Sequence, residues 1–187
     1  MNQNRTNTAL LVMLAVSGAL NVLLAMKVRS LEQPALAAPR IKVGSHLEDI
    51  IGSGPSGAAF TVRFADSQVS TVLLVLRPGC QWCDANMPDW KVLIQEKGQN
   101  FRFVAVSLSP IDFGKYMEGS KLNVPGVSPS FGENPTFRGV TATPQTIIVD
   151  SDGTVRKIWL GAYTQEIKQD VETYFGTKLP VVVQPSS

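Results

Sequence analysis

Two cysteines, Cys80 and Cys83, carry the most evident chemistry of this 187-residue sequence, and they are its only cysteines. They stand two residues apart in the run Cys-Gln-Trp-Cys. A disulfide across so short a loop stabilises a fold only a little. A small fold stapled by disulfides carries more cysteines at wider spacing. We therefore predict that the pair acts chemically and is not a structural crosslink.

The alternative interpretation of such a pair is a metal site. Structural zinc is held by four ligands, mostly cysteine and histidine. The sequence has no second Cys-x-x-Cys, and its single histidine, His46, lies near the start of the folded part. We predict neither a metal site nor a bound cofactor, and we interpret His46 as a solvated side chain.

The cysteines stand between a predicted buried strand and a predicted helix. Residues 71–76 (TVLLVL) form an apolar, β-rich run that is typical of a strand buried on both faces. A turn at 77–79 ends this run, and a helical apolar pattern begins at Cys80. At a helix amino terminus the free N–H groups and the helix dipole favour a thiolate. Since a thiolate is the nucleophile of disulfide exchange, Cys80 is predicted to attack and Cys83, one turn on, to resolve.

Other apolar runs predict the rest of an α/β domain. The remaining strands are expected at 60–64, 101–107, 146–149 and 155–160. Thr164 is placed to cap a last helix and Gly176 to end it, while 112–118 is a candidate short helix. Prolines between 125 and 135 favour irregular chain there. This order predicts a central mixed β-sheet flanked by helices.

An uncharged apolar stretch precedes the domain. Residues 8–26 carry no charge and, as a helix, would just span a bilayer core of roughly 30 Å. We predict a single-pass membrane anchor with the N-terminus inside and the domain in the periplasm or outside the cell. A cleaved signal peptide is the alternative, and residues 35–37 (Ala-Leu-Ala) have the small-x-small form that it needs. Both interpretations export the rest of the chain.

The predicted organisation has four segments. They are an anchor or signal sequence over 1–29, a linker over 30–45, a folded domain over 46–178 and a flexible tail over 179–187. The net charge of +2 comes without a basic block, which argues against a nucleic-acid partner. The expected partners are a lipid bilayer, through residues 8–26, and proteins.

The sequence resembles the thioredoxin superfamily, and within it the TlpA-like, membrane-anchored thiol–disulfide oxidoreductases. The resemblance rests on Cys80 and Cys83, on Pro88 in the following helix and on the run 139–144, Gly-Val-Thr-Ala-Thr-Pro. It implies a thioredoxin fold, with Cys80 and Cys83 as catalytic residues, a helix kinked at Pro88 and a cis bond before Pro144, beside the cysteines.

The resemblance also implies a function. It indicates exchange with protein thiols and disulfides outside the cytoplasm, more in the reducing direction, as in the maturation of cytochrome c or copper-site proteins. A membrane or periplasmic redox partner would supply the electrons. Thr143 and Pro144 are expected to bind substrate by β-type backbone pairing. Trp82 is either a partner contact or a packed surface aromatic.

Three positions depart from the family pattern. Gly79 replaces a common tryptophan, Leu74 stands where many thioredoxins have a buried acid, and Asn86 stands where many TlpA-like proteins have glutamate. Two other functions stay open. One is a thiol peroxidase of the redoxin type, although Arg77 stands where peroxiredoxin-like sites carry Thr or Ser. The other is a non-catalytic anchored binding module, which the missing acids favour.

Overall fold

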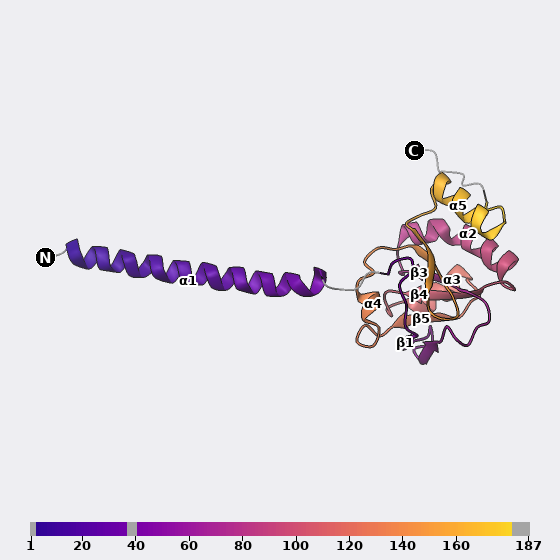
Figure 1. Cartoon of the computed structure of the whole chain (residues 1–187), viewed down its shortest axis with the longest axis horizontal. Coiled ribbons are helices and arrows are strands. Elements are labelled where there is room, and N and C mark those ends of the chain that lie inside the picture. The colour runs from indigo at the N-terminus through magenta and orange to yellow at the C-terminus, as the bar shows by residue number, and fades with distance from the viewer. Residues whose placement is uncertain (1–2, 37–40, 181–187) are drawn as a thin grey trace. The chain divides into compact units, whose positions relative to one another are not determined.

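The computed structural model describes residues 3–36 and 41–180, and the chain divides into two compact units, 1–38 and 39–187. The first unit holds helix α1 (Gln3–Leu36), which includes the apolar stretch 8–26 and continues into the range predicted as linker (Figure 1). Among the residues searched, which are those with a described placement, no helix has both the length and the apolarity of a membrane span. The anchor over 8–26 stays a prediction.

The second unit is built on one seven-stranded sheet, with the strand order β2-β1-β5-β4-β3-β6-β7. The central strand β3 pairs parallel with β4 and antiparallel with β6, and β4 pairs parallel with β5. The remaining pairs are antiparallel, so the predicted mixed sheet is confirmed. The strands are β1 (Ile50–Ser53), β2 (Ala59–Val62), β3 (Thr71–Leu76), β4 (Arg102–Ser107), β5 (Gly126–Pro129), β6 (Gln145–Val149) and β7 (Val155–Leu160).

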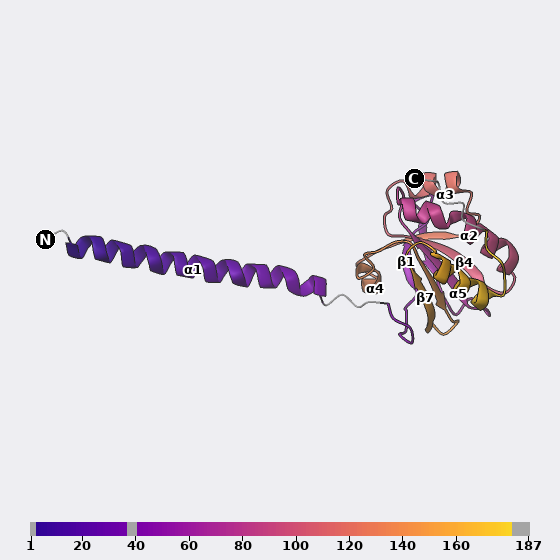
Figure 2. The same cartoon turned by 90° about the horizontal axis from the view of Figure 1, so that it is seen from above.

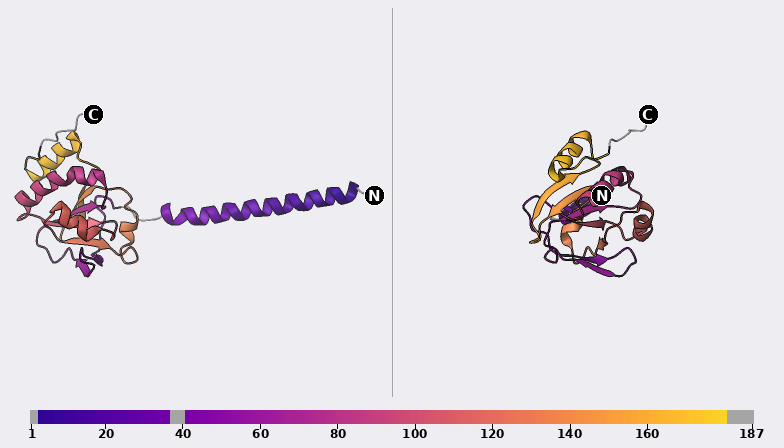
Figure 3. Two further views of the ribbon diagram at one scale, coloured as in Figure 1. Left: turned by 180° about the vertical axis from the view of Figure 1, so that it is seen from behind. Right: turned by 90° about the vertical axis from the view of Figure 1, so that its right-hand side faces the viewer.

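Side chains alternate along β3 and enter a separate core on each face of the sheet. Val72, Leu74 and Leu76 pack on the face covered by α2, α3 and α5. Leu73 and Val75 pack on the other face, where Phe137 of α4 lies. Figure 2 shows α3 next to α2, and Figure 3 shows α5 beside α2. The helices are α2 (Gln81–Lys97), α3 (Phe113–Ser120), α4 (Pro135–Arg138) and α5 (Gln165–Phe175).

The strongest sequence patterns match the observed elements closely. The expected strands at 71–76 and 155–160 have the bounds of β3 and β7. Helix α5 begins after Thr164, whose hydroxyl accepts from the Ile167 N–H at 3.4 Å. It ends at Gly176 in the left-handed conformation, as its C-cap signal predicted.

The prolines between 125 and 135 misled the sequence interpretation, because β5 lies inside that range. Its residues are buried, and β5 pairs with β4 on one side and β1 on the other. Gly126 suits this position because an added Cβ would meet the Phe113 ring at 2.7 Å. Tertiary pairing and close packing therefore outweigh local propensity here.

The folded unit begins before residue 46, the predicted boundary. The Gly44 N–H donates to the Val155 carbonyl at 2.8 Å, and the Val155 N–H donates to the Ser45 carbonyl at 2.9 Å. Ile41 packs against the core on the α4 face. Two backbone bonds and one apolar contact therefore bring part of the predicted linker into the domain.

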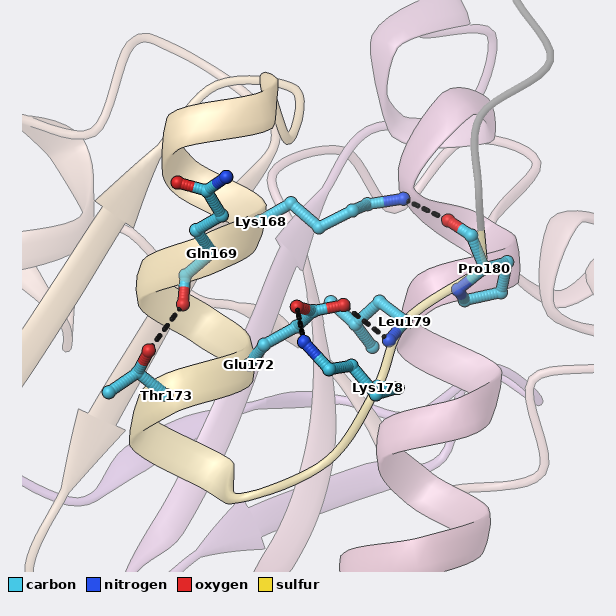
Figure 4. Close-up of polar contacts among 7 residues, drawn as sticks. All are labelled: Lys168, Gln169, Glu172, Thr173, Lys178, Leu179 and Pro180. Atoms are coloured by element: carbon cyan, nitrogen blue, oxygen red, sulfur yellow. Dashed lines mark hydrogen bonds and ion pairs between the residues drawn. The ribbon is translucent and has the colours of Figure 1, made fainter.

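The folded unit also extends past residue 178. Leu179 is buried, and its N–H donates to a Glu172 carboxylate oxygen at 2.8 Å. The other oxygen of Glu172 pairs with the Lys178 ammonium at 2.9 Å, and Lys168 donates to the Pro180 carbonyl (Figure 4). We call these contacts the tail clamp. Its bonds hold Leu179 and Pro180, which the sequence placed in a flexible tail.

Candidate active site

Cys80 is the N-cap residue of α2, in an extended conformation with φ −89° and ψ 105°. Its carbonyl accepts the Cys83 N–H at 2.9 Å and the Asp84 N–H at 3.2 Å, which starts the helix. Gly79 makes the preceding turn with a φ of +76°, in the left-handed region that favours glycine. The strand, turn and helix thus place the first cysteine at the helix end, as predicted.

Cys83 lies one turn into α2 and has 0% of its surface exposed. Its neighbours in the core come from α2, β3 and the sheet around them. Cys80, in contrast, is only half-buried. An incoming partner can therefore reach the Cys80 sulfur, whereas the Cys83 sulfur is covered.

The Thr143–Pro144 peptide bond is cis, as predicted, and it lies beside Cys80. The Thr143 hydroxyl donates to the Cys80 sulfur at 3.4 Å, and the Cys80 thiol donates to the Thr143 carbonyl at 3.8 Å. The Pro144 carbonyl accepts the Gly161 N–H at 2.8 Å. The structure therefore brings Cys80, Cys83, Thr143 and Pro144 together from segments about 60 residues apart.

Partial burial alone would raise the pKa of Cys80, but hydrogen bonds outweigh it and lower the pKa below its ordinary value. The donors are the Cys83 thiol, the Thr143 hydroxyl and the N–H groups of Cys83 and Trp82. These groups stabilise the charged form of the sulfur. A lowered pKa increases the fraction of thiolate at neutral pH, and thiolate is the reactive form.

Burial raises the pKa of Cys83 to about 12, and its hydrogen bond to Cys80 acts in the same direction. Leu74, at the position of the acid in many thioredoxins, lies in the core on the same face as Cys83. Asn86 is fully buried, and its amide accepts the Tyr163 N–H at 2.8 Å and donates to the Gly161 carbonyl at 3.3 Å. Asn86 therefore orders the loop between β7 and α5, a role that the sequence analysis missed.

Two further polar pairs near α2 were not predicted. The Tyr116 hydroxyl donates to an Asp84 carboxylate oxygen at 2.7 Å. Asp89, whose side chain is 3% exposed, pairs with Lys168 at 2.8 Å. Burial raises the pKa of Asp89, while Lys168 opposes that rise. Apart from their helical positions, these residues share no motif in the sequence, so only the fold reveals the pairs.

The other candidate residues lie near the surface. Trp82 is 58% exposed on the first turn of α2. His46 is exposed and forms a single β-bridge with Thr154. Among the side chains that the structure describes, no cluster of three or more His, Cys, Asp or Glu residues is arranged to hold a metal ion.

Several known structures with a similar fold are thiol–disulfide oxidoreductases or isomerases. A thio-disulfide isomerase from Thermus thermophilus has a TM-score of 0.52 and 23% identity, over 74% of this chain and 100% of its own. The thioredoxin domain of a Bacteroides vulgatus thiol-disulfide oxidoreductase has a TM-score of 0.55 and 20% identity, over 72% and 99%. A secreted Mycobacterium tuberculosis disulfide oxidoreductase has a TM-score of 0.52 and 16% identity, over 67% and 93%.

At these identities the likeness shows the fold, and the chain has the thioredoxin fold. No protein-family profile matches the sequence. No curated relative matches it either.

Proposed function

We propose that this thioredoxin-fold chain is a thiol–disulfide oxidoreductase that exchanges disulfides with other proteins through Cys80 and Cys83. One observation carries the proposal. The half-exposed Cys80 sulfur lies at the amino-terminal end of α2 beside the Thr143–Pro144 segment, and hydrogen-bond donors that stabilise its thiolate surround it. The names of the structures with the same fold support this assignment.

The reaction transfers two electrons. The Cys80 thiolate attacks a substrate disulfide, which forms a Cys80–substrate disulfide and releases one substrate thiolate. Cys83 then loses its proton, and its thiolate attacks the Cys80 sulfur. This step forms the Cys80–Cys83 disulfide and releases the second substrate thiolate. The substrate disulfide is reduced and the cysteine pair is oxidised, while the reverse order of steps oxidises a substrate dithiol.

Thr143 is proposed to position the substrate. Thr143 precedes β6, and among the described residues its N–H donates to no backbone carbonyl. An extended substrate segment could therefore pair with this N–H next to the reacting sulfur, as in strand addition. Trp82, exposed on the adjacent turn, offers an aromatic surface to the same partner.

The proposed setting is the outer face of a membrane. The uncharged stretch 8–26 within α1 supports anchoring, and the resemblance to anchored oxidoreductases supports reduction of exported proteins. Substrates of cytochrome c or copper-site maturation fit that direction, with a membrane or periplasmic redox partner to restore the dithiol. The similar protein of M. tuberculosis is also described as secreted.

Reduction of insulin by the full-length chain in mild detergent tests the proposal. The reduced protein is expected to precipitate insulin in the presence of dithiothreitol, and the variant with both Cys80→Ser and Cys83→Ser is expected to match the uncatalysed rate. Equal rates for the two proteins would overturn the proposal. Peroxide consumption without insulin reduction would indicate a thiol peroxidase instead. A reduction potential near about −270 mV would favour the reducing direction, and one near about −120 mV the oxidising direction.

A further inference from the structure

A groove lies between α2 and α3, directly beside the turn that carries Cys80. Its walls are the turn residues 77–79, one side of α2 and the segment 109–120, which includes most of α3. Its volume is about 760 Å³, within the usual range of roughly 300–1,000 Å³ for binding pockets. Figure 2 shows α2 and α3 next to each other on this side of the unit.

Glycines leave the groove open at two places. Gly79 stands where the resembling family often has a tryptophan, and a Cβ added to Gly79 would meet no atom within 4 Å. Gly119, on α3, also has free space at its Cβ position. Neither thiol lines the groove, and neither do Thr143 and Pro144. The groove is therefore distinct from the segment proposed to pair with the substrate backbone.

The apolar part of the groove suits a side chain from a partner. Ile111 is 72% exposed in the loop before α3, at the edge of the groove. Buried Met87 lines the same groove, together with Pro78. An apolar side chain placed here would cover Ile111 and remove it from water, at a gain proportional to the area buried.

The charged part of the groove favours an anionic partner. Arg77, Lys91 and Lys115 are exposed at its edge, and among the described residues none of the three forms an ion pair or a side-chain hydrogen bond. Two carboxylates also line it, and one of them, Asp84, already accepts the Tyr116 hydroxyl at 2.7 Å. The groove therefore carries three positive charges against two negative ones, and this excess of positive charge attracts partners of negative potential.

We propose that this groove docks an acidic polypeptide segment with an apolar anchor residue, and that this segment belongs to the redox partner of the cysteine pair. The inference rests on the proposed function, since it makes the segment part of the exchange partner. Acidic side chains would face Arg77, Lys91 and Lys115, and the anchor would cover Ile111. Docking beside residue 79 would hold the partner's disulfide or dithiol close to Cys80, which increases the rate of encounter.

Binding of two synthetic peptides to the full-length chain in mild detergent tests the docking step alone. Both peptides lack cysteine and carry alternating apolar residues, one with glutamates and the other with lysines at the remaining positions. The protein carries Cys80→Ser and Cys83→Ser, so no covalent step contributes. The acidic peptide is expected to bind at least about tenfold more tightly at low salt, and added salt should reduce the difference.

Three variants identify the surface. The pair Lys91→Glu and Lys115→Glu is expected to abolish the preference for the acidic peptide. The pair Lys42→Glu and Arg63→Glu changes the net charge equally on exposed side chains outside the groove, and it should leave the preference unchanged. Gly119→Trp should weaken binding of the acidic peptide without any change of charge, because its ring fills free space in the groove.

The exchange step is measured separately with wild-type cysteines. Rates with a disulfide between acidic peptides should fall about tenfold in the Lys91→Glu, Lys115→Glu protein, while rates with hydroxyethyl disulfide should not change. Equal binding of the two peptides, or equal effects of both charge-reversed pairs, would refute the groove proposal. A dimer of the chain that dissociates on the substitution Gly119→Trp would also refute it, because a second copy of the chain would then occupy the groove. If the wild-type chain does not exchange with hydroxyethyl disulfide at all, the proposed function is contradicted instead.

Discussion

At the scale of single residues, the two cysteine sulfurs lie one helical turn apart, yet their surroundings shift their pKa values in opposite directions. Donors around Cys80 outweigh its partial burial and lower its pKa, whereas burial raises the pKa of Cys83. The side chain of Asn86 is an amide and cannot take up a proton from Cys83. This difference supports the proposed order, in which Cys80 attacks and Cys83 resolves.

We predict that Cys80 reacts first. Iodoacetamide added to the reduced chain at mildly acidic pH should label Cys80, because a lowered pKa leaves more thiolate below the ordinary pKa of a thiol. The labelling rate should rise with pH and level off once pH exceeds the Cys80 pKa, while Cys83 stays protected. Cys83→Ser should trap substrates as mixed disulfides, and Cys80→Ser should trap few. Mass spectrometry that finds Cys83 labelled first would reverse the assignment.

A second prediction concerns Thr143. Thr143→Val removes the hydroxyl that donates to the Cys80 sulfur at 3.4 Å. Without this donor the charged form of the sulfur is less stabilised, so the pKa of Cys80 should rise. The pH profile of alkylation measures this rise. Thr141→Val, at an exposed position in the same loop, serves as the control and should leave the profile in place.

Several site residues could be predicted from the sequence because short motifs specify them. The cysteine pair follows a strand and opens a helix, and Thr143 and Pro144 end a recognisable run. The bonds of Asn86 could not be predicted, since they join residues 75 and 77 positions apart. Nothing local to Asn86 indicates which loop the helix will face.

At the scale of elements, α2 and α5 are joined across their interface by a buried ion pair. Asp89 and Lys168 have side chains only 3% and 12% exposed, so solvent screens their attraction little. Trp90 of α2 and Val171 and Phe175 of α5 are buried in the same core. The pair therefore joins the helix that carries the cysteines to the last helix of the fold.

We predict that Lys168→Met destabilises the domain by about 3–5 kcal/mol at neutral pH, because the Asp89 charge is left buried without a partner. Burial already raises the pKa of Asp89 in the folded state, and loss of Lys168 should raise it further. Protonation of Asp89 removes the cost of its buried charge, so the deficit should be constant above that pKa and should shrink as pH falls from it toward the ordinary pKa of a carboxyl group in the unfolded chain. Urea unfolding at several pH values measures the effect.

Two controls accompany this variant. Combining Lys168→Met with Asp89→Leu should recover most of the lost stability, because neither charge is then buried alone. Lys178→Met breaks a pair in which the lysine side chain is 90% exposed, and it should cost less than about 1 kcal/mol. A pH-independent deficit in Lys168→Met would argue that the lost contact with Pro180 causes it.

The elements themselves were predictable where a pattern was continuous. The strands β3 and β7 and the caps of α5 follow directly from apolar runs and from Thr164 and Gly176. The strands β1 and β5 could not be predicted in this way, because each has only four residues and β5 ends in a proline. Their place in the sheet comes from pairing with each other and with β4, which are long-range contacts.

At the scale of the whole molecule, the chain has two units, one formed by helix α1 and the other by the thioredoxin fold. In this unit the Cys80 side chain is half-buried and the Cys83 side chain is buried. The helix contains the uncharged stretch 8–26, whose length matches a bilayer core. This division suits an enzyme that works on proteins at a membrane surface, which we propose as its setting.

We predict that the intact chain sediments with membranes of its host and is digested by protease added to spheroplasts. The physical reason is the cost of leaving an uncharged apolar helix in water. A chain that lacks residues 1–40 should stay in the supernatant and is the matched control. Full-length protein in the cytosolic supernatant would refute the anchor, and a shortened chain in the periplasmic fraction would indicate a cleaved signal.

The tail clamp determines where a second protein can be fused to the C-terminal end of the domain without loss of its contacts. Leu179 is buried and held by Glu172, and Lys168 holds the carbonyl of Pro180 (Figure 4). A fluorescent reporter fused after Pro180 would leave these bonds in place. The same reporter fused after Gly176 would remove them, together with the bond from Thr177 to Glu96 of α2. The shorter fusion would then report on a loosened α5 and not on the native enzyme.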